Sequence, residues 1–409
     1  MKTNILAALV KLLSIVVGLI VSVMVAANIP KDQFGSYSYF FSAVLVVASI
    51  SNVGISHRAL YFIPKIKSTY SIIGIYKKAL CLLVFSSFLA TVILVPFFYS
   101  ESKEVLSFGL IFFLAVYVRN VNLVNVSMLR SKDMPVLSLF FESVIFYVFV
   151  AILLPIYYYE SELVVTGCLF LCATASTFWV AKVARAGKRE PSLHREGFFT
   201  FKELKPYMIL GVLESLTVNF DVVVVGFFYS NEETAEYFFA KKLLVAFGAV
   251  WYVYNYIYTP KISRLFADEK RNDAAIEAVL KMKWPVLGVS LAGMLSFFLM
   301  YKTIFLYVGL EEYASIDIYV VGFMFFVCFH IVTGPVMSFL NVSGLASYTS
   351  RVLVVGALSF ALSLPLMMAV FDVAGVMLSL LFSLICWKAY GCYITRKKLG
   401  IDLVLGRCL

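Results

Sequence analysis

Charged residues are scarce in this sequence. Only 14% of its 409 residues are charged and 62% are hydrophobic, whereas soluble domains have about 25% charged and 45–50% apolar residues. The charges lie in short clusters between long apolar runs, and a helix of about 20 apolar residues spans the hydrocarbon core of a bilayer. The scarcity of charge therefore excludes an ordinary soluble protein and predicts a chain that crosses a membrane many times.

The alternation of apolar and polar residues that barrel strands require is also missing. Such strands alternate over about ten residues, but the stretches 72–98 and 285–306 show no such pattern. Backbone groups in lipid must be hydrogen-bonded within the protein, which leaves helices as the remaining solution. The sequence thus predicts an all-α membrane protein with about twelve transmembrane helices in two six-helix halves around a central cavity.

The predicted helices fall into two groups along the chain. They occupy residues 5–29, 37–57, 72–98, 105–129, 135–157, 162–182, 206–228, 236–258, 284–306, 315–339, 350–371 and 374–395. The predicted divisions are an N-terminal half at 1–182, a basic connection at 183–205, a C-terminal half at 206–395 and a tail at 396–409. A further short amphipathic helix is expected within 267–283, lying on the anionic inner leaflet.

Basic residues are distributed unevenly among the connections. Most of the 34 lysines and arginines lie in one alternate set of loops, and the other set contains only Lys31, Lys103 and Lys302. Loops rich in lysine and arginine stay in the cytoplasm. Both termini are therefore predicted to be cytoplasmic, in a multi-pass protein of the bacterial inner membrane. This distribution also accounts for the net charge of +10 without nucleic-acid binding.

Several motifs of enzymes and metal sites are absent from the sequence. There is no Walker loop, no His-x-x-x-His pair, no Gly-x-Ser-x-Gly and no Cys-x-x-Cys. No His accompanies Cys168 and Cys172, which are interpreted as small packing residues. We therefore expect no enzyme activity, no cofactor and no metal, and any transport must use an ion gradient or the gradient of the substrate itself.

Ionisable residues nevertheless occur inside the predicted spans, where they are costly and usually face the interior of the bundle or a wet cavity. Lys11 shares a helix face with small residues. Two interpretations of that face stay open: it packs against another helix, or it lines a cavity. Arg119 lies near Asn122, and Glu142 has a similar predicted depth on the next helix. Arg119 therefore either pairs with Glu142 or is held in a cavity for an anionic substrate.

A second group of such residues lies in the C-terminal half. Glu214 and Asp221 are seven residues apart and share a face, and Asp221 matches Lys241 in predicted depth. The matched depth predicts an Asp221–Lys241 salt bridge. Tyr252 and Asn255 lie on the same face as Lys241, and this polar stripe is expected to line the cavity.

His330 and Lys388 complete the set of polar residues within the predicted spans. A lone histidine in an apolar helix is more often a packing residue than a site, but His330 shares its face with Tyr319 and Asn341. Lys388 lies near the inner end of the last helix and is expected to extend its ammonium group to the interface.

Local motifs resemble one transporter family. They are Asp221-Val-Val-Val-Val-Gly226-Phe-Phe, Ala235-Glu236-Tyr237-Phe-Phe-Ala240-Lys241, Pro260-Lys261-Ile262-Ser263, Phe34-Gly35-Ser36-Tyr37, and the segment from Gly334-Pro335 to Asn341-Val-Ser-Gly344. Together with the length and charge pattern, they resemble the polysaccharide flippases, the O-antigen (Wzx-type) transporters of the multidrug/oligosaccharidyl-lipid/polysaccharide superfamily. Glu236 departs from that pattern, because the family often has Gly before this Tyr.

The resemblance implies a flippase that moves undecaprenyl-diphosphate-linked oligosaccharide from the inner to the outer face of the cytoplasmic membrane, driven by an ion gradient through alternating access. The partners it implies are this lipid-linked substrate, the bilayer, and proteins that polymerise the repeat units and set chain length. The residues expected to bind the diphosphate and sugars are Lys11, Arg119, Asn122, Lys241, Tyr252, Asn255 and His330. Those expected to exchange a coupling ion are Glu142, Glu214 and Asp221.

Three alternatives remain open at this point. An O-antigen polymerase or ligase acts on the same lipid-linked sugars, but it would be expected to have a large outer loop, and the predicted outer loops are short and acidic. A cation-coupled drug antiporter of the same superfamily would be expected to have a net acidic cavity. A flippase for lipid II or teichoic-acid precursors cannot be separated from O-antigen export by the sequence.

Overall fold

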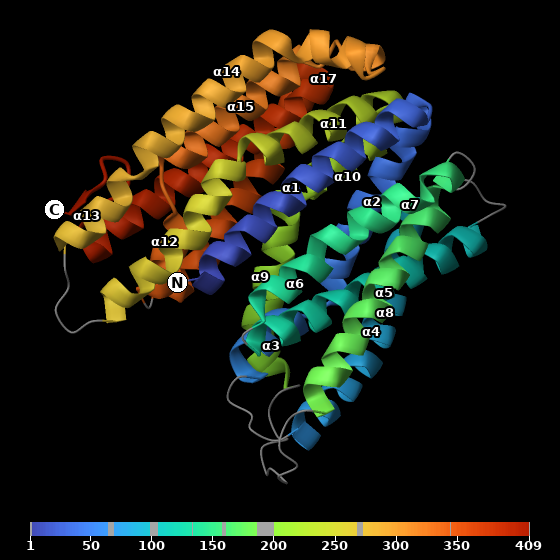
Figure 1. Ribbon diagram of the computed structural model, residues 1–409, viewed down its shortest axis with the longest axis horizontal. Helices are drawn as coiled ribbons and strands as arrows, with labels where there is room; N and C mark the ends of the chain where they lie inside the picture. The colour runs from blue at the N-terminus through green and yellow to red at the C-terminus, as the bar shows by residue number, and fades with distance from the viewer. Residues whose placement is uncertain are drawn as a thin grey trace. The chain divides into compact units, whose positions relative to one another are not determined.

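The computed structural model describes residues 2–63, 69–98, 105–132, 134–157, 161–185, 200–267, 273–343 and 345–408. These residues are almost entirely helical (Figure 1). The strands among them form one small antiparallel hairpin, in which β1 (Ile401–Asp402) pairs with β2 (Arg407–Cys408). The predicted all-α fold is confirmed.

The helices group into two compact units, residues 28–231 and residues 1–27 with 232–409. The units do not follow the predicted halves, which were cut by chain order. The first helix of the chain belongs with 232–409, and the predicted seventh helix belongs with 28–231. Each half therefore contributes its first helix to the other unit, as expected if the halves are repeats of one arrangement.

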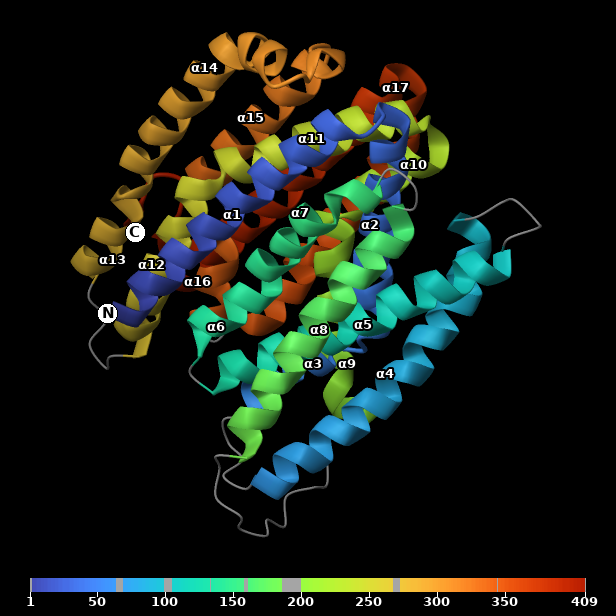
Figure 2. The same ribbon diagram turned by 45° about the vertical axis from the view of Figure 1, so that its right-hand side comes forward.

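Unit 28–231 is built around α5 (Val105–Ser131), which contacts α2, α3, α4, α6 and α8. Figure 2 shows α5 lying between α4 and α8. The other elements of this unit are α2 (Lys31–Ser51), α3 (Ile55–Phe62), α4 (Thr69–Phe98), α6 (Pro135–Leu139), η2 (Phe140–Val144), α7 (Ile145–Tyr157), α8 (Ser161–Arg185), α9 (Phe201–Val218) and α10 (Phe220–Phe228). Both α9 and α10 pack on α2.

The second unit contains the first helix and the C-terminal part of the chain. In both views α1 lies alongside α11 and α12 (Figures 1 and 2). Its elements are α1 (Lys2–Asn28), α11 (Asn231–Phe247), α12 (Ala249–Ala267), α13 (Asp273–Lys281), α14 (Lys283–Tyr307), η3 (Glu311–Tyr313), α15 (Asp317–Val332), α16 (Val336–Val342) and α17 (Ala346–Leu399).

Several predicted helices are interrupted or bent. The predicted helix 206–228 breaks at Asn219, and 236–258 breaks at Gly248. The break between α15 and α16 contains Pro335, which lacks the N–H that a continuous helix needs. Asp372, with φ 49° and ψ −132°, separates the last two predicted helices within α17. The interruptions leave the predicted spans in place, and the prediction of about twelve transmembrane helices is confirmed.

The outer faces of two long helices are apolar and exposed. On α4 the side chains of Phe85, Phe88 and Val92 are exposed, and on α14 Leu299 is 82% exposed. Within the described ranges, nine helical stretches are long and apolar enough to cross a membrane, and the last of them contains both predicted helices of α17. Such surfaces suit lipid tails rather than water. The chain is therefore a multi-pass membrane protein.

The predicted amphipathic helix near residue 275 is present as α13. Its apolar side chains Ile276 and Leu280 are fully buried in one cluster with Ile401 and Leu403 of the C-terminal hairpin. The apolar side of this helix is therefore not available to insert into lipid, and its position at the inner leaflet stays a prediction. Its apolar side packs on the hairpin instead of lipid, because the chain end folds back onto it.

Candidate functional site

The interior of unit 28–231 contains a buried network of amide and hydroxyl groups. Asn120, on α5, is fully buried and accepts a hydrogen bond from Asn52 Nδ2 at 3.0 Å. Its own amide donates to the hydroxyls of Ser51 at 2.8 Å and Ser87 at 3.1 Å. Polar groups at such depth are stable only when they are paired. The network therefore fixes α2, α4 and α5 relative to one another.

Two further asparagines of α5 extend this network. Asn125 accepts a hydrogen bond from the Tyr76 hydroxyl at 2.7 Å and donates to Ser176 Oγ at 2.9 Å. Asn122 donates to the carbonyl oxygen of Phe141 at 3.3 Å and accepts from Ser176 at 3.0 Å. The Asn122 side chain thus contacts η2 and α8, and its hydrogen bond to Phe141 supports the turn that carries Glu142.

Glu142 lies in the middle of a π-helical turn, η2, between α6 and α7. Such widened turns are rare and frequently occur at functional sites. The Glu142 carboxylate accepts a hydrogen bond from Arg130 Nη2 at 2.7 Å, and the two side chains are 30% and 37% exposed. Arg130, at the end of α5, thus makes the hydrogen-bonded ion pair with Glu142, whereas Arg119 acts on this carboxylate only at longer range.

Arg119 still lies in the surroundings of this pair. Its guanidinium interacts electrostatically with Glu142, Tyr147 and Cys172, and its Nε is buried without a hydrogen-bond partner in the described structure. Arg119 and Arg130 are eleven residues apart, which places them within about 20° of one another around the helix. Among the described side chains of this region, two guanidinium groups on one face of α5 thus lie near one carboxylate.

A polar cavity adjoins the Arg130–Glu142 pair. Its volume is about 370 Å³, and its lining comes from α2, α3, α5, α9 and η2 together with the turns that join them. This size is at the lower end of small-molecule sites. The polar side chains of its wall include those of Asn52, His57, Ser127, Ser215 and Asn219. Sequence analysis missed this cavity, because its residues come from segments that are distant in the chain.

The turn between α2 and α3 shapes one wall of the cavity. Asn52 Oδ1 accepts hydrogen bonds from the Ser56 backbone N at 2.9 Å and the Ser56 hydroxyl at 2.8 Å. Gly54 has a φ of 72°, and a Cβ there would lie 2.4 Å from the backbone nitrogen of Met208 on α9. Only glycine allows both this conformation and this approach.

Two of the sequence motifs that carry the family resemblance meet in this unit. A Cβ on Gly226, in α10, would lie 2.3 Å from the ring of Tyr39, which follows the Phe-Gly-x-Tyr turn on α2. The missing side chain of Gly226 therefore permits α10 to pack closely on α2. The structure gives these motif residues a packing role.

Lys388 and His330 lie together in the second unit. Lys388 is 1% exposed, and its ammonium group donates to the carbonyl oxygen of Gly334 at 2.7 Å. The expectation that Lys388 reaches the interface is therefore wrong, because the break after α15 offers it carbonyl oxygens inside the protein. The His330 ring contacts Trp251 and Trp387 with centroids 5.7 and 6.0 Å away, as a packing residue would.

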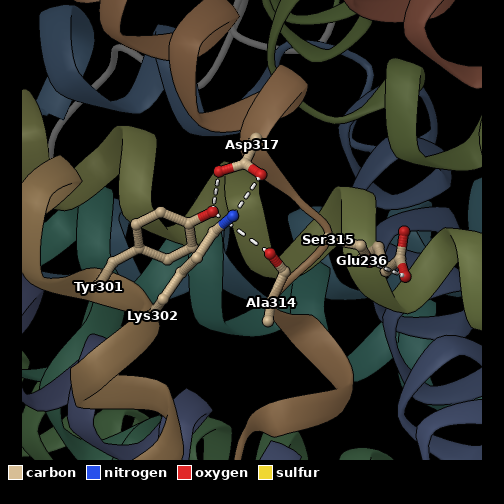
Figure 3. Close-up of polar contacts among 6 residues, drawn as sticks. All are labelled: Glu236, Tyr301, Lys302, Ala314, Ser315 and Asp317. Carbon is tan, nitrogen blue, oxygen red and sulfur yellow. Dashed lines mark hydrogen bonds and ion pairs between the residues drawn. The ribbon is translucent and has the colours of Figure 1, made fainter.

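A third polar cluster joins α14 to α15 (Figure 3). Lys302 Nζ lies 2.8 Å from Asp317 Oδ2, and the Tyr301 hydroxyl donates to the other oxygen of the same carboxylate. Ser315 donates to Glu236 at 3.1 Å on the neighbouring α11. The sequence feature that indicated this cluster was Lys302, one of the few basic residues in the predicted outer loops.

Three of the residues predicted to bind substrate lie elsewhere in the second unit. Lys11 is half-buried on α1, and none of the described residues pairs with its ammonium group. Tyr252 is 41% exposed on α12. Asn255, on the same helix, has a buried Oδ1 without a hydrogen-bond partner among the described residues. These residues have polar groups available to a ligand.

The predicted Asp221–Lys241 pair stays a prediction. Asp221 is 1% exposed at the start of α10 in unit 28–231. Lys241 is half-buried on α11 in the other unit. Glu214 lies on α9, but its side chain is outside the part of the chain that the structure describes.

Comparisons with known proteins give similarity in structure only. No protein-family model and no curated protein matches the sequence. The lipid II flippase MurJ in an inward closed conformation has a TM-score of 0.71 and 15% identity, covering 96% of this chain and 87% of its own. An inward-facing multidrug resistance MATE transporter has a TM-score of 0.69 and 13% identity, covering 96% and 98%. The Vibrio cholerae MATE transporter VcmN has a TM-score of 0.67 and 15% identity, covering 98% of each chain. This chain therefore shares the fold of these flippase and multidrug transporters.

Proposed function

We propose that this protein flips undecaprenyl-diphosphate-linked oligosaccharide, an O-antigen or related repeat unit, from the inner to the outer face of the bacterial cytoplasmic membrane. The observation that carries the proposal is that two arginines, Arg119 and Arg130, lie near one carboxylate, Glu142, among the described side chains of this part of unit 28–231. A buried positive charge is costly unless it meets an anion. The fold shared with a lipid II flippase is compatible with this substrate class.

The chemistry of the substrate fits the residues proposed for its binding. A polyprenyl tail can stay in lipid, whereas the diphosphate needs cations, and the planar guanidinium of Arg119 suits phosphate oxygens. Lys11 and Lys241 are proposed as further cations for the diphosphate. Tyr252, Asn255 and His330 are proposed to contact sugars, to which they offer hydroxyl, amide and ring faces. Asn122, in unit 28–231, is proposed to support the turn that carries Glu142.

We further infer an ion-coupled, alternating-access cycle. Glu142, Glu214 and Asp221 are the proposed carboxylates that exchange a proton or Na⁺, because the charge of the emptied site must be compensated when the substrate leaves. The proposed partners are the bilayer, the lipid-linked oligosaccharide, and proteins that polymerise the repeat units and control chain length. Both chain termini are proposed to be cytoplasmic.

Substitutions at Arg119 test this function. Arg119→Lys keeps the charge but loses the planar donor pair, and Arg119→Ala loses both. We expect the lipid-linked oligosaccharide reaching the outer face, or O-antigen at the cell surface, to fall from wild type to Lys to Ala at unchanged protein level. Arg351→Ala is the control, because Arg351 is exposed and lies over the ring of Tyr348. Full activity of Arg119→Ala would contradict the proposal.

A multidrug antiporter is the second candidate, because two MATE transporters share the fold. A site for cationic drugs requires carboxylates in excess, and the described part of the α5 site has arginines in excess. Deletion of the gene separates the two functions. A flippase mutant accumulates lipid-linked oligosaccharide on the inner face, whereas an antiporter mutant becomes sensitive to cationic drugs with normal surface polysaccharide.

A further inference from the structure

The break between α15 and α16 removes the usual partners of two carbonyl oxygens. In a continuous helix each carbonyl oxygen accepts from the N–H group four residues later, so Gly334 would be the donor to His330. Val336 would in the same way be the donor to Val332. Here Gly334 N donates to Ile331 O at 3.1 Å, and Val336 N donates to Gly334 O at 3.0 Å. The carbonyl oxygens of His330 and Val332 therefore depend on donors from outside their own helix.

The sequence of the break explains why α15 ends there. Gly334 has a φ of 73°, a left-handed conformation that glycine adopts without steric cost. Pro335 follows it and has no N–H group to continue the helix. The unpaired carbonyl groups at the C-terminal end of a helix carry a partial negative charge, which favours a cation beside them.

Two lysines from neighbouring helices supply the missing donors. Lys388, on α17, donates to the carbonyl oxygen of Gly334 at 2.7 Å and lies 3.4 Å from that of His330. Lys283, at the start of α14, donates to the carbonyl oxygen of Val332 at 2.7 Å. Both α14 and α17 pack on α15 (Figures 1 and 2). The carbonyl oxygens that the break releases are thus the ones that the two lysines take.

The contacts of Lys283 show that its side chain is an ammonium ion. It donates to three carbonyl oxygens, those of Val332, Leu403 and Val404. A carbonyl oxygen only accepts, so three hydrogen bonds need three N–H groups, which the protonated side chain has. A positive charge is therefore held at the break by backbone dipoles.

The described polar contacts of the Lys388 ammonium group are also backbone carbonyl oxygens. The group lies 4.9 Å from the centroid of the Trp387 ring, and Lys283 acts on it as a second cation. Lys388 is only 1% exposed. A charge at such depth is stable when groups of opposite polarity surround it. Carbonyl oxygens of interrupted helices stabilise Na⁺ inside other transporters in the same way.

We propose that the break between α15 and α16 is a site for a small monovalent cation, and that the Lys388 ammonium group of the chain itself occupies it in place of a free ion. Burial, carbonyl oxygens and a negative helix end are what such an ion requires. A tethered cation is always present, so the break keeps its shape without an ion from solution. The inference does not depend on the proposed substrate, and it leaves the proposed ion exchange to the carboxylates.

The test removes the tethered cation and offers free ones. Thermal midpoints of purified full-length Lys388→Ala in detergent are measured in ammonium, ethylammonium, sodium, potassium and tetramethylammonium chloride at equal ionic strength. Ethylammonium resembles the end of the missing side chain, whereas tetramethylammonium is larger and has no N–H group. We expect the midpoint to be below that of wild type in tetramethylammonium and to rise by about 2 °C in ammonium or ethylammonium, as for a ligand at about ten times its dissociation constant. A rise in sodium or potassium instead would show that the site prefers a metal ion.

Two control variants separate a cation site from other effects. Lys388→Gln keeps N–H donors without a charge, and it should be less stable than wild type in every salt. Lys397→Ala removes an exposed lysine of the same helix, whose Nζ lies 3.1 Å from the Tyr393 hydroxyl, and it should respond to the salts as wild type does. Wild-type stability of Lys388→Gln would show that the break needs a donor rather than a cation. That result, or a rise in Lys388→Ala that Lys397→Ala shares, would overturn the proposal.

A second variant covers the case in which Lys388→Ala does not fold in ordinary salts. Lys283→Ala opens the carbonyl oxygen of Val332 at the same break and should be stabilised by the same small cations. Both variants are also purified with ethylammonium chloride present throughout. If neither variant gains stability or folds in any of the small cations, the carbonyl oxygens hold no free cation and the proposal is wrong.

Discussion

The ammonium group of Lys283, at the start of α14, lies 2.7 Å from the carbonyl oxygen of Val404 in the C-terminal hairpin. The same group donates to the carbonyl oxygens of Leu403 and, at 2.7 Å, of Val332 at the end of α15. Lys283 is fully buried. One side chain thus connects the chain end to two helices.

Replacement of Lys283 should therefore destabilise the protein. Lys283→Met removes three hydrogen bonds from a charged donor and leaves buried carbonyl oxygens unpaired, which costs about 1–3 kcal/mol. Thermal unfolding in detergent should show a lower midpoint. The control is Lys281→Met, because the Lys281 side chain is 61% exposed and its pair with Glu277 is worth little. Equal losses in the two variants would contradict the role of Lys283.

The α14–α15 cluster in Figure 3 gives a second prediction. Tyr301→Phe removes a hydroxyl that donates to Asp317 and is 3.3 Å from the carbonyl oxygen of Ala314. The ring stays in place, so we expect a loss of about 1 kcal/mol from the hydrogen bonds alone. Lys302→Gln should cost less, because its pair with Asp317 is about half-exposed. Thermal midpoints of both variants check this order, and the reverse order would refute it.

A third prediction concerns the turn that shapes the cavity. Gly54→Ala should destabilise the protein by more than about 1 kcal/mol, because a side chain at positive φ is strained and would collide with α9. Gly288→Ala is the matched control, since nothing lies within 4 Å of a Cβ at that helical position. Alanine there should be neutral or stabilising. A stable Gly54→Ala protein with an unchanged thermal midpoint would be inconsistent with the observed turn.

The orientation in the membrane can be tested by labelling single cysteines with an impermeant maleimide, after replacement of the native cysteines. Residues 231–234 and 311–313 should react in intact cells, because they belong to the predicted outer loops. Residues 190–200 should react only after permeabilisation. Labelling of 190–200 from outside would reverse the predicted topology.

The predicted Asp221–Lys241 pair is tested by exchange of its charges. Asp221→Asn or Lys241→Gln alone should lower folding yield or transport, because removal of one partner leaves a buried charge uncompensated at a cost of several kcal/mol. The double variant Asp221→Lys/Lys241→Asp should recover part of the loss. Wild-type behaviour of both single variants would show that the two residues are not coupled.

The sequence predicted the helices well, because the membrane imposes a minimum length on every apolar run. The runs at 72–98 and 105–129 correspond to α4 and α5 almost residue for residue. Breaks inside helices were less visible. Pro335 signalled one of them, whereas Asp372 and Asn219 are residue types that occur in continuous helices as well.

The candidate site was predicted only in part. Helical angle and depth brought Arg119, Asn122 and Glu142 into one neighbourhood, and the structure places them there. The same reasoning offered Arg119 as one possible partner of Glu142, whereas the structure places Arg130 Nη2 at 2.7 Å from the carboxylate. The π turn at Phe140–Val144 changes the direction of the side chain by an amount that no sequence period reveals.

The sequence by itself determined the environment of this protein, its helical class and the positions of its spans, because hydrocarbon accepts only long apolar helices with satisfied backbones. The tertiary structure alone decided which polar groups meet. Arg130 and Glu142 form a pair at the wall of a cavity, and Lys388 lies inside the protein rather than at the interface. These outcomes depend on turns and helix breaks that bring distant segments together, where short-range hydrogen bonds select among partners of similar charge.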